Sequence, residues 1–244
     1  MPVAPDDDRK QAEIEYPRAV GESGRTWIRL KPFQSTPDET ARLLIDFAHV
    51  VQLLELAPGM TLCELGCGSG WISRLAARHG VRAEGYDISP DMIEIAREQA
   101  AEEGLDVHYE TGDMEQLDLG RRFDACLLYD ALHHSPRADL VLASARRALR
   151  PGGRVLLAEP NWTQRFEGRK AVGEYGVTEL GYTPRKLKRI LRDQGFTDIH
   201  RFHPVRKRLP SNSPRDVALH LGGPLAYRAL GPFWTQIWLR ARAS

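Results

Sequence analysis

The segment Glu64-Leu65-Gly66-Cys67-Gly68-Ser69-Gly70 decides the fold class of this 244-residue chain. It follows a short apolar run at 60–65 and precedes a helical pattern at 71–79. Glycines let the backbone turn sharply, and they let a ligand approach because no Cβ stands in the way. A strand, a glycine-rich turn and a helix in this order predict the first unit of an α/β sheet with a ligand at the turn.

The spacing of the glycines differs from that of a dinucleotide-binding loop. Such a loop has its third glycine five positions after the first, whereas here Gly70 follows Gly66 by four positions and Trp71 takes the fifth. A large indole there blocks the close helix–strand packing that the third glycine permits. Glu64 would also repel a pyrophosphate. The loop therefore favours a ligand with cationic character.

Strand-like and helical segments alternate along the chain after residue 58. This alternation predicts an α/β fold with a doubly wound, mostly parallel sheet and helices on both faces. Ser89 and Pro90 mark one helix start, as cap and first helical residue. The predicted strands are 60–65, 82–86, 107–109, 123–129, 154–158, 196–202 and 235–242, and the other predicted helices are 71–79, 137–149 and 183–194.

Residues 1–57 are predicted to form an N-terminal extension with a cap helix, ahead of a main domain at 58–244. Residues 1–20 are polar with an acidic run, so we expect them to be mobile. Residues 27–33 form an aromatic and basic cluster without clear periodicity. The sequence Ser35-Thr36-Pro37-Asp38-Glu39 predicts the start of an amphipathic helix at about 38–56.

Two segments interrupt the alternation of strands and helices, at 160–182 and 203–234. They follow the fifth and sixth strands, and ligands of open α/β sheets bind beyond the carboxyl ends of strands. Long loops at such places are more often functional than filler. We therefore predict that both insertions are lids over a ligand.

Composition excludes several classes of protein. The chain is 42% hydrophobic and 27% charged, with a mean hydropathy of −0.42, as in globular proteins. No apolar stretch reaches the roughly 18 residues of a membrane span, and the acidic start does not resemble a secretory signal. Three cysteines without a C-x-x-C motif predict a reduced, cytoplasmic setting.

Charge is distributed unevenly although the net charge is only +1. Residues 181–244 carry 13 Lys and Arg against 3 Asp and Glu, whereas the rest of the chain carries 21 against 30. The basic part is either a solvated face or a surface for an anionic partner.

Acidic side chains follow the next two predicted strands. Asp87 comes 21 residues after Gly66, where a carboxylate can accept hydrogen bonds from two ribose hydroxyls. Its alternative role is to cap the helix that begins near Ser89. After the third strand, Asp113 can accept from an exocyclic amine and the Met114 thioether can lie on a purine face, unless the pair is an ordinary turn.

These segments together resemble the class I S-adenosylmethionine-dependent methyltransferases, in their broad small-molecule group. The resemblance covers about residues 58–160. It is carried by the loop at 64–70, Gly85-Tyr86-Asp87-Ile88-Ser89-Pro90-Asp91-Met92, Gly112-Asp113-Met114, Phe123-Asp124-Ala125, Tyr129-Asp130-Ala131-Leu132-His133-His134 and Leu149-Arg150-Pro151-Gly152-Gly153.

The resemblance implies a Rossmann-like sheet of seven strands, with an antiparallel last strand supplied by 235–242. It also implies S-adenosylmethionine as cofactor, with S-adenosylhomocysteine as product. The implied contacts are Glu64, Gly66, Cys67, Gly68 and Gly70 for the methionyl part, Asp87 for the ribose, Asp113 and Met114 for the adenine, and Ile88, Met92, Tyr129, Trp27 and Lys31 as further cofactor-binding residues.

Methyl transfer from a sulfonium is an in-line displacement, for which the protein positions the acceptor and excludes water. A hydroxyl acceptor gains from a general base, and histidine titrates near neutrality. We predict His134 as this base, followed by His133 and Asp130, at the end of the strand 123–129. The alternative is that these side chains only shape the pocket. Residues 159, 161 and 162 are candidates of lower rank.

The predicted function is O-methylation of a small molecule, such as a secondary metabolite or a sugar-containing acceptor. N- or C-methylation, a lipid-linked or macromolecular acceptor, and a non-catalytic S-adenosylmethionine-binding module stay open as alternatives. No recognisable nucleic-acid-binding motif is present, so nucleic acid is not a predicted partner. The other histidines lack metal-ligand spacing, so no metal is predicted. The segment 203–234 either contacts a membrane surface or packs on the core, and a monomer or homodimer is expected.

Overall fold

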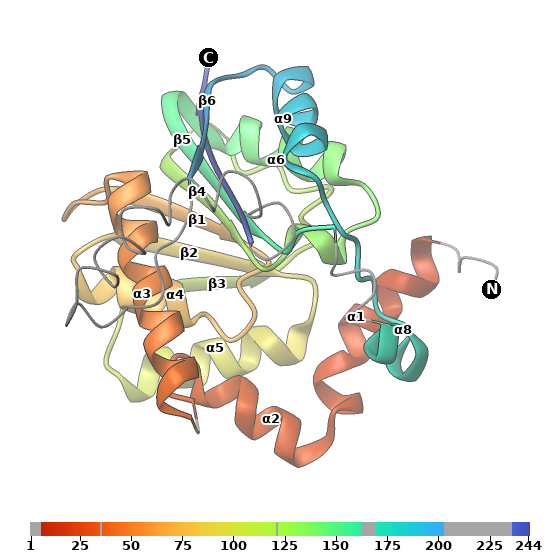
Figure 1. Ribbon diagram of the computed structural model, residues 1–244. Coiled ribbons are helices and arrows are strands. Elements are labelled where there is room, and N and C mark those ends of the chain that lie inside the picture. Colours follow the sequence, from red (N-terminus) through yellow and green to blue (C-terminus); the bar gives the residue numbers. More distant parts are fainter. Residues whose placement is uncertain (1–5, 35, 121, 163–168, 203–235) are drawn as a thin grey trace, which may run out of the picture.

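The computed structural model describes residues 6–34, 36–120, 122–162, 169–202 and 236–244 (Figure 1). Its centre is a seven-stranded sheet with the strand order β3-β2-β1-β4-β5-β7-β6. Only β7 runs antiparallel to its neighbours, β5 and β6. The predicted doubly wound sheet with an antiparallel last strand is therefore confirmed. The strands are β1 (Thr61–Leu65), β2 (Arg82–Asp87), β3 (His108–Thr111), β4 (Phe123–Tyr129), β5 (Leu149–Glu159), β6 (Phe196–Phe202) and β7 (Ile237–Ala243).

The central strand β4 shows why both faces of the sheet are covered. All seven of its residues are buried, and successive side chains of a strand point to opposite faces. Leu127 packs in the apolar cluster that contains α3 and α4, whereas Leu128 packs in the cluster that contains α6 and α9. A nearly continuous apolar run, interrupted in β4 only by Asp124, is typical of a strand that is buried on both sides.

Helices lie on both faces of the sheet in Figure 1. The helices α3, α4 and α5 pack on one face, and α6 and α9 pack on the other. Their bounds are α3 (Pro37–Leu54), α4 (Trp71–Arg78), α5 (Pro90–Glu102), α6 (Ala138–Ala148) and α9 (Pro184–Asp193). Three further helices are α1 (Asp6–Ala19), α2 (Gly21–Leu30) and α8 (Arg169–Tyr175), and Leu132–His134 form the short 3-10 turn η1.

Two predicted helix starts are confirmed by their side-chain caps. The Oγ of Thr36 accepts a hydrogen bond from the backbone N–H of Glu39 at 3.3 Å, and Thr183 does the same for α9. Ser89 differs, because its hydroxyl donates to the carbonyl oxygen of Ile14 instead of capping α5. The Asp87 carboxylate accepts the N–H of Ser89, the residue just before α5.

The sequence analysis did not predict the two helices that residues 6–30 form. Residues 6–19, predicted to be mobile, form α1, and most of the cluster at 27–33 lies in α2 or just after it. Helix α1 is ordered by tertiary partners that its composition does not reveal. Lys10 forms ion pairs with Asp113 and Glu115, and Arg18 pairs with Asp91. Tertiary packing commonly provides most of the stability of a short helix.

Two other boundaries also differ from the sequence prediction. Helix α6 ends at Ala148, and β5 begins at Leu149, so the Pro151-Gly152-Gly153 segment belongs to a longer strand. The predicted lid at 203–234 lies outside the described residues. Within the part of the chain that is described, no helix is both long and apolar enough to cross a membrane.

Candidate cofactor and acceptor site

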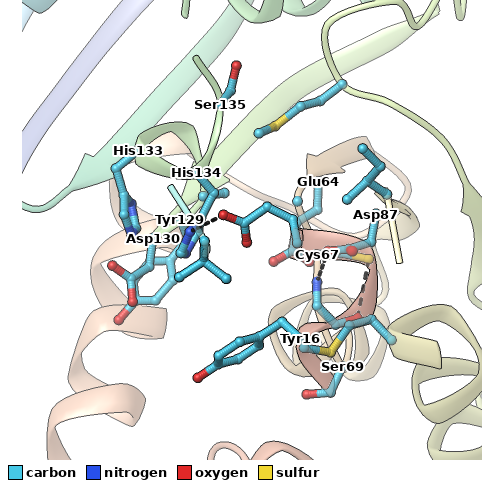
Figure 2. A pocket seen from close by; sticks show the side chains of 18 of the residues that line it. Tyr16, Glu64, Cys67, Ser69, Asp87, Tyr129, Asp130, His133, His134 and Ser135 are labelled. Carbon is cyan, nitrogen blue, oxygen red and sulfur yellow. Dashed lines mark hydrogen bonds and ion pairs between the residues drawn. The ribbon is translucent and has the colours of Figure 1, made fainter. Parts of the chain in front are cut away.

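A cavity of about 300 Å³ lies at the carboxyl ends of β1, β2 and β4. The order of strands reverses between β1 and β4, and open α/β sheets place their ligand crevice at such a switch point. The structure brings together almost all of the predicted site residues at this cavity (Figure 2). Those that line it are Trp27, Lys31, Glu64, Gly66, Cys67, Gly68, Asp87, Ile88, Met92, Asp113, Met114, Tyr129, Asp130, His133 and His134.

Gly70 is the one predicted cofactor-binding residue that does not line the cavity. It precedes α4 with a φ of +70°, and a Cβ there would meet the Tyr109 ring at 2.4–2.6 Å. Gly66, with a φ of +71°, is equally restricted, because its Cβ would lie 2.6 Å from that of Ala131. Packing therefore requires glycine at both positions.

Gly68 is different, because the space beside it is open. Its φ is +52°, and no heavy atom lies within 4 Å of the place where a Cβ would stand. Its N–H donates to the Asp87 carboxylate at 2.9 Å. The middle of the loop is thus fixed by β2 while its open side faces the cavity, which allows close approach of a ligand.

Asp87 connects the glycine loop to α5. One carboxylate oxygen accepts the N–H of Gly68 and the other accepts the N–H of Ser89, both at 2.9 Å. Burial raises the pKa of Asp87. The predicted alternative, a cap for the helix near Ser89, is met only in that Asp87 accepts the N–H of Ser89 itself, because no side-chain cap bonds to the first turn of α5. Each oxygen has a second lone pair, so bonding to a ribose stays a compatible prediction.

Glu64 places a buried carboxylate beside the loop. Its side chain is 2% exposed and accepts hydrogen bonds from the backbone and hydroxyl of Ser73. Burial raises the pKa of Glu64 to about 7, against the opposing effect of the Ser73 bonds. The carboxylate is therefore half ionised near neutral pH, and a cationic ligand would favour its ionised form.

Helix α1 supplies cavity residues that sequence reasoning missed. Lys10 bonds to Asp113 at 2.7 Å and to Glu115 at 2.5 Å, and Glu13 and Tyr16 also line the cavity. These residues of α1 are spaced three apart and so share one helix face. That periodicity was the available signal, but the polar composition of the segment obscured it.

The turn after β4 is held by a buried carboxylate. Glu159, at the end of β5, accepts the N–H groups of Ala131, Leu132 and His133. Its Oε2 also lies 2.9 Å from Nδ1 of His133. Glu159 is fully buried and is not among the lining residues, so it positions His133 from behind. Asn161 and Trp162 do not line the cavity either.

His134 lies against His133, with ring centroids 4.0 Å apart. Its Nδ1 is 2.9 Å from the carbonyl oxygen of Thr178 and 3.3 Å from a carboxylate oxygen of Glu13. Burial lowers the pKa of His134, but Glu13, Glu179 and Asp130 outweigh this effect and raise the pKa to about 10. The His134 ring is therefore protonated on both nitrogens and positively charged at neutral pH.

Tyr129 contributes its ring to the cavity while its hydroxyl is engaged elsewhere. The hydroxyl donates to the buried carboxylate of Asp46 at 2.7 Å. Burial and Asp46 raise the pKa of Tyr129 well above its usual value. Its hydroxyl therefore stays protonated and is unsuited to act as a base.

Comparison with known proteins gives a match for the central part of the chain, which supplies most of the cavity lining. Residues 62–153 match the model of a family described as "Methyltransferase domain". The chain is also 30% identical over 138 residues to the ubiquinone biosynthesis O-methyltransferase of Brucella anthropi, and the match covers 56% of each chain. The match therefore spans little more than half the length of that curated relative.

Solved structures share the fold at lower sequence identity. Phosphoethanolamine N-methyltransferase 2 of Haemonchus contortus, in complex with S-adenosyl-L-methionine, has a TM-score of 0.59 at 20% identity, over 88% of this chain and 59% of that chain. The cyclase SpnF has a TM-score of 0.66 at 20% identity, over 99% and 97%. An N-methyltransferase and a cyclase share this architecture, so the likeness shows the fold and not the reaction.

The sheet order and the cavity at its switch point define a Rossmann-like α/β protein with a methyltransferase fold. The matched domain contains the glycine loop, the end of β2 and the turn after β4. Residues 62–153 of this chain are thus similar to a methyltransferase domain, and the rest of the chain builds on the same sheet.

Proposed function

We propose that this protein transfers the methyl group of S-adenosylmethionine to an oxygen atom of a small-molecule acceptor. The observation that carries the proposal is that the glycine loop and the histidine pair after β4 face one cavity. A donor held at the loop would then lie beside groups able to take a proton from an acceptor. The name of the Brucella relative, an O-methyltransferase, supports oxygen as the acceptor atom.

The proposed cofactor contacts use the geometry of the loop and its neighbours. The Glu64 carboxylate would bind the ammonium of the methionyl part, and Asp87 would accept from the ribose. The adenine would lie near Asp113 and Met114. Lys10 already bonds to the Asp113 carboxylate, so we expect Lys10 to share or release this carboxylate when the adenine amine binds.

We propose His133 as the group that receives the acceptor proton. Its Nδ1 faces a carboxylate, so Nδ1 carries hydrogen and the neutral ring keeps a lone pair on Nε2. An imidazole oriented by a carboxylate is a recurrent general base. The S–CH3 bond would break as the O–CH3 bond forms, and the hydroxyl proton would pass to Nε2. Asp130 and His134 remain the next candidates, although His134, whose pKa is raised to about 10, would first have to lose its second proton.

The charge of the cavity bears on the class of acceptor. Two lysines face seven carboxylates, so the lining favours a neutral or cationic acceptor over an anion. This acidic lining also supports a second candidate function, N-methylation of an amine. The carboxylates that line the cavity are Glu13, Glu64, Asp87, Asp113, Glu115, Asp130 and Glu179.

A cytoplasmic setting remains part of the proposal, supported by three buried free cysteines.

The test is to supply S-adenosylmethionine with a 13C-labelled methyl group together with phenols, sugar alcohols and amines. We expect labelled methyl ethers, recognised by mass and by the carbon chemical shift of the methyl group. Methylated amines alone would replace the first proposal with the second. Cofactor binding without transfer to any acceptor would indicate a non-catalytic binding module.

Two glycine substitutions should separate cofactor binding from folding. Gly68→Val strains a positive φ and fills open space, so we expect loss of S-adenosylmethionine affinity of at least tenfold, with destabilisation limited to about 1–2 kcal/mol. Gly70→Val places side-chain atoms in the Tyr109 ring, so the thermal midpoint should fall much further. Calorimetric titration and thermal unfolding measure the two effects. Wild-type affinity in Gly68→Val would contradict the assigned position of the ligand.

Cofactor affinity should depend on pH through Glu64. A ligand ammonium binds the ionised carboxylate, and the pKa of about 7 means that this form grows from a minority at pH 6 to a majority at pH 8. We expect S-adenosylmethionine to bind roughly tenfold more tightly at pH 8 than at pH 6. The dependence should vanish in Glu64→Gln, which should also bind more weakly at pH 8. Titrations across this range measure it, and an unchanged slope in the variant would contradict the assignment.

The same pKa has a consequence for stability without ligand. The folded-state pKa of Glu64 is raised above its usual value, so the folded state binds more protons between about pH 4.5 and 7. The contribution of Glu64 to the free energy of unfolding therefore falls as pH rises through this window. In Glu64→Gln the free energy of unfolding should not show this fall between about pH 4.5 and 7.

A further inference from the structure

His133, His134 and Glu179 gather at the end of the cavity that the cofactor contacts leave to the acceptor. One nitrogen of each ring and one carboxylate oxygen of Glu179 all lie within 4.8 Å of one another. Nε2 of His133 is 3.6 Å from Oε2 of Glu179. Ligands about 2.1 Å from a tetrahedral zinc ion stand about 3.4 Å apart, so small side-chain shifts would bring these atoms to coordination distances.

The neighbours of both histidines direct the same nitrogen toward an ion. Nδ1 of His133 faces Glu159 at 2.9 Å, and Nδ1 of His134 faces the carbonyl oxygen of Thr178 at 2.9 Å. A carbonyl or carboxylate can only accept, so each Nδ1 carries hydrogen and each neutral ring has its lone pair on Nε2. Histidine ligands of metals commonly donate their other N–H to such groups.

The segment that carries Glu179 is fixed next to the histidines by backbone contacts. The N–H of Leu180 donates to the carbonyl oxygen of His133 at 3.0 Å, and the N–H of Thr178 donates to Glu13 at 2.6 Å. Glu179 is therefore placed by the fold, although it lies 45 residues beyond His134 in the sequence. Sequence spacing, which predicted no metal, cannot reveal such a set.

The surrounding charge favours a cation. Glu13 and Glu159 contact the two rings, and Glu179 contacts His133. The two rings are thus surrounded by three carboxylates, and an ion that binds here would displace the second proton that His134 carries at neutral pH. Two imidazoles and one carboxylate are a donor set that suits zinc and other divalent transition ions.

We propose that Nε2 of His133, Nε2 of His134 and the Glu179 carboxylate bind one divalent transition-metal ion, with an open position toward the cavity. The role of the ion rests on the proposed function. The acceptor hydroxyl would occupy the open position, where the ion lowers its pKa and its proton passes to water. The resulting oxygen attacks the methyl carbon as the S–CH3 bond breaks. The ion uses both Nε2 lone pairs, so with the ion bound it replaces His133 in the deprotonation step, and His133 is the base only in the metal-free site.

The test begins with binding and does not require turnover. Untagged protein is stripped with a chelator and titrated with Zn²⁺ by calorimetry, and Co²⁺ provides visible absorption that reports the coordination geometry. We expect one ion per chain and an intense Co²⁺ spectrum of four- or five-coordinate type. Glu179→Gln should weaken Zn²⁺ binding at least tenfold, whereas Glu174→Gln, on exposed α8, should bind like the wild type. Circular dichroism checks that both variants fold.

Three outcomes decide between the proposals. Absence of stoichiometric binding, or equal Zn²⁺ affinity in the two variants, overturns the metal site. Methyl transfer that persists in chelator also overturns the catalytic role of the ion and leaves His133 as the base. Stoichiometric Zn²⁺ binding that depends on Glu179, without methylation of any hydroxyl acceptor, supports the site and overturns the proposed function.

Discussion

Asp87→Asn is expected to reduce the affinity for S-adenosylmethionine by about 100-fold or more. The wild-type carboxylate uses one oxygen for Gly68 and the other for Ser89, and its remaining lone pairs are proposed to accept from the ribose. Asparagine keeps one accepting oxygen and has an NH2 group, which cannot accept a hydrogen bond, in place of the other. At that position the variant loses both the backbone N–H contact and the proposed contact with the ribose.

Calorimetric titration at pH 8 measures this loss, and thermal unfolding shows whether the fold survives. Asp106→Asn is the matched control, because Asp106 is exposed in the turn before β3 and does not line the cavity. We expect the control to bind like the wild type. An Asp87→Asn protein that is folded and binds with wild-type affinity would refute the ribose assignment.

The sequence predicted the parts of the fold that depend on local patterns. The bounds of β4 and β6, 123–129 and 196–202, were predicted to the residue. In β4 the apolar residues are interrupted only by Asp124 and bounded by Arg122 and Asp130, and in β6 the strand lies between Gly195 and a proline-containing segment. The glycine loop and Asp87 were equally visible, because tight turns and strand ends restrict the residue types that fit there.

The missing part of the site depends on contacts between distant segments. Lys10 meets Asp113 across 103 positions, and Glu13 meets Thr178 across 165. No local periodicity encodes these pairs. The sequence also ranked His134 above His133, because it could not show that Glu159 orients one ring and Thr178 the other. Orientation of a side chain is a tertiary property, whereas its position after a strand is a local one.

Glu159→Gln is expected to lower kcat by about 100-fold or more with a smaller change in KM. Whether His133 accepts a proton or binds an ion, it needs a lone pair on Nε2. The glutamine amide can keep its oxygen toward the N–H groups of Ala131 and Leu132, which places its NH2 group toward the His133 ring. Nδ1 must then accept, so the hydrogen moves to Nε2 and the lone pair there is lost.

The same substitution should also destabilise the fold. The NH2 group would face the backbone N–H of His133, which now bonds to the carboxylate. One buried donor is left unsatisfied and a charged acceptor is removed, which costs about 2–4 kcal/mol. Denaturant unfolding measures this loss, and nitrogen NMR of the imidazole rings reports the tautomer.

The control and the alternative outcome separate tautomer from stability. Glu110→Gln, in β3, removes an exposed carboxylate that does not line the cavity and should leave kcat unchanged. Steady-state kinetics are measured well below the thermal midpoint of each variant, so loss of folded protein does not lower kcat. If Glu159→Gln kept wild-type kcat while its His133 ring showed the hydrogen on Nε2, the Nε2 lone pair would have no part in methyl transfer. Asp130 would then be the group to examine, since it faces the same cavity from the residue directly after β4.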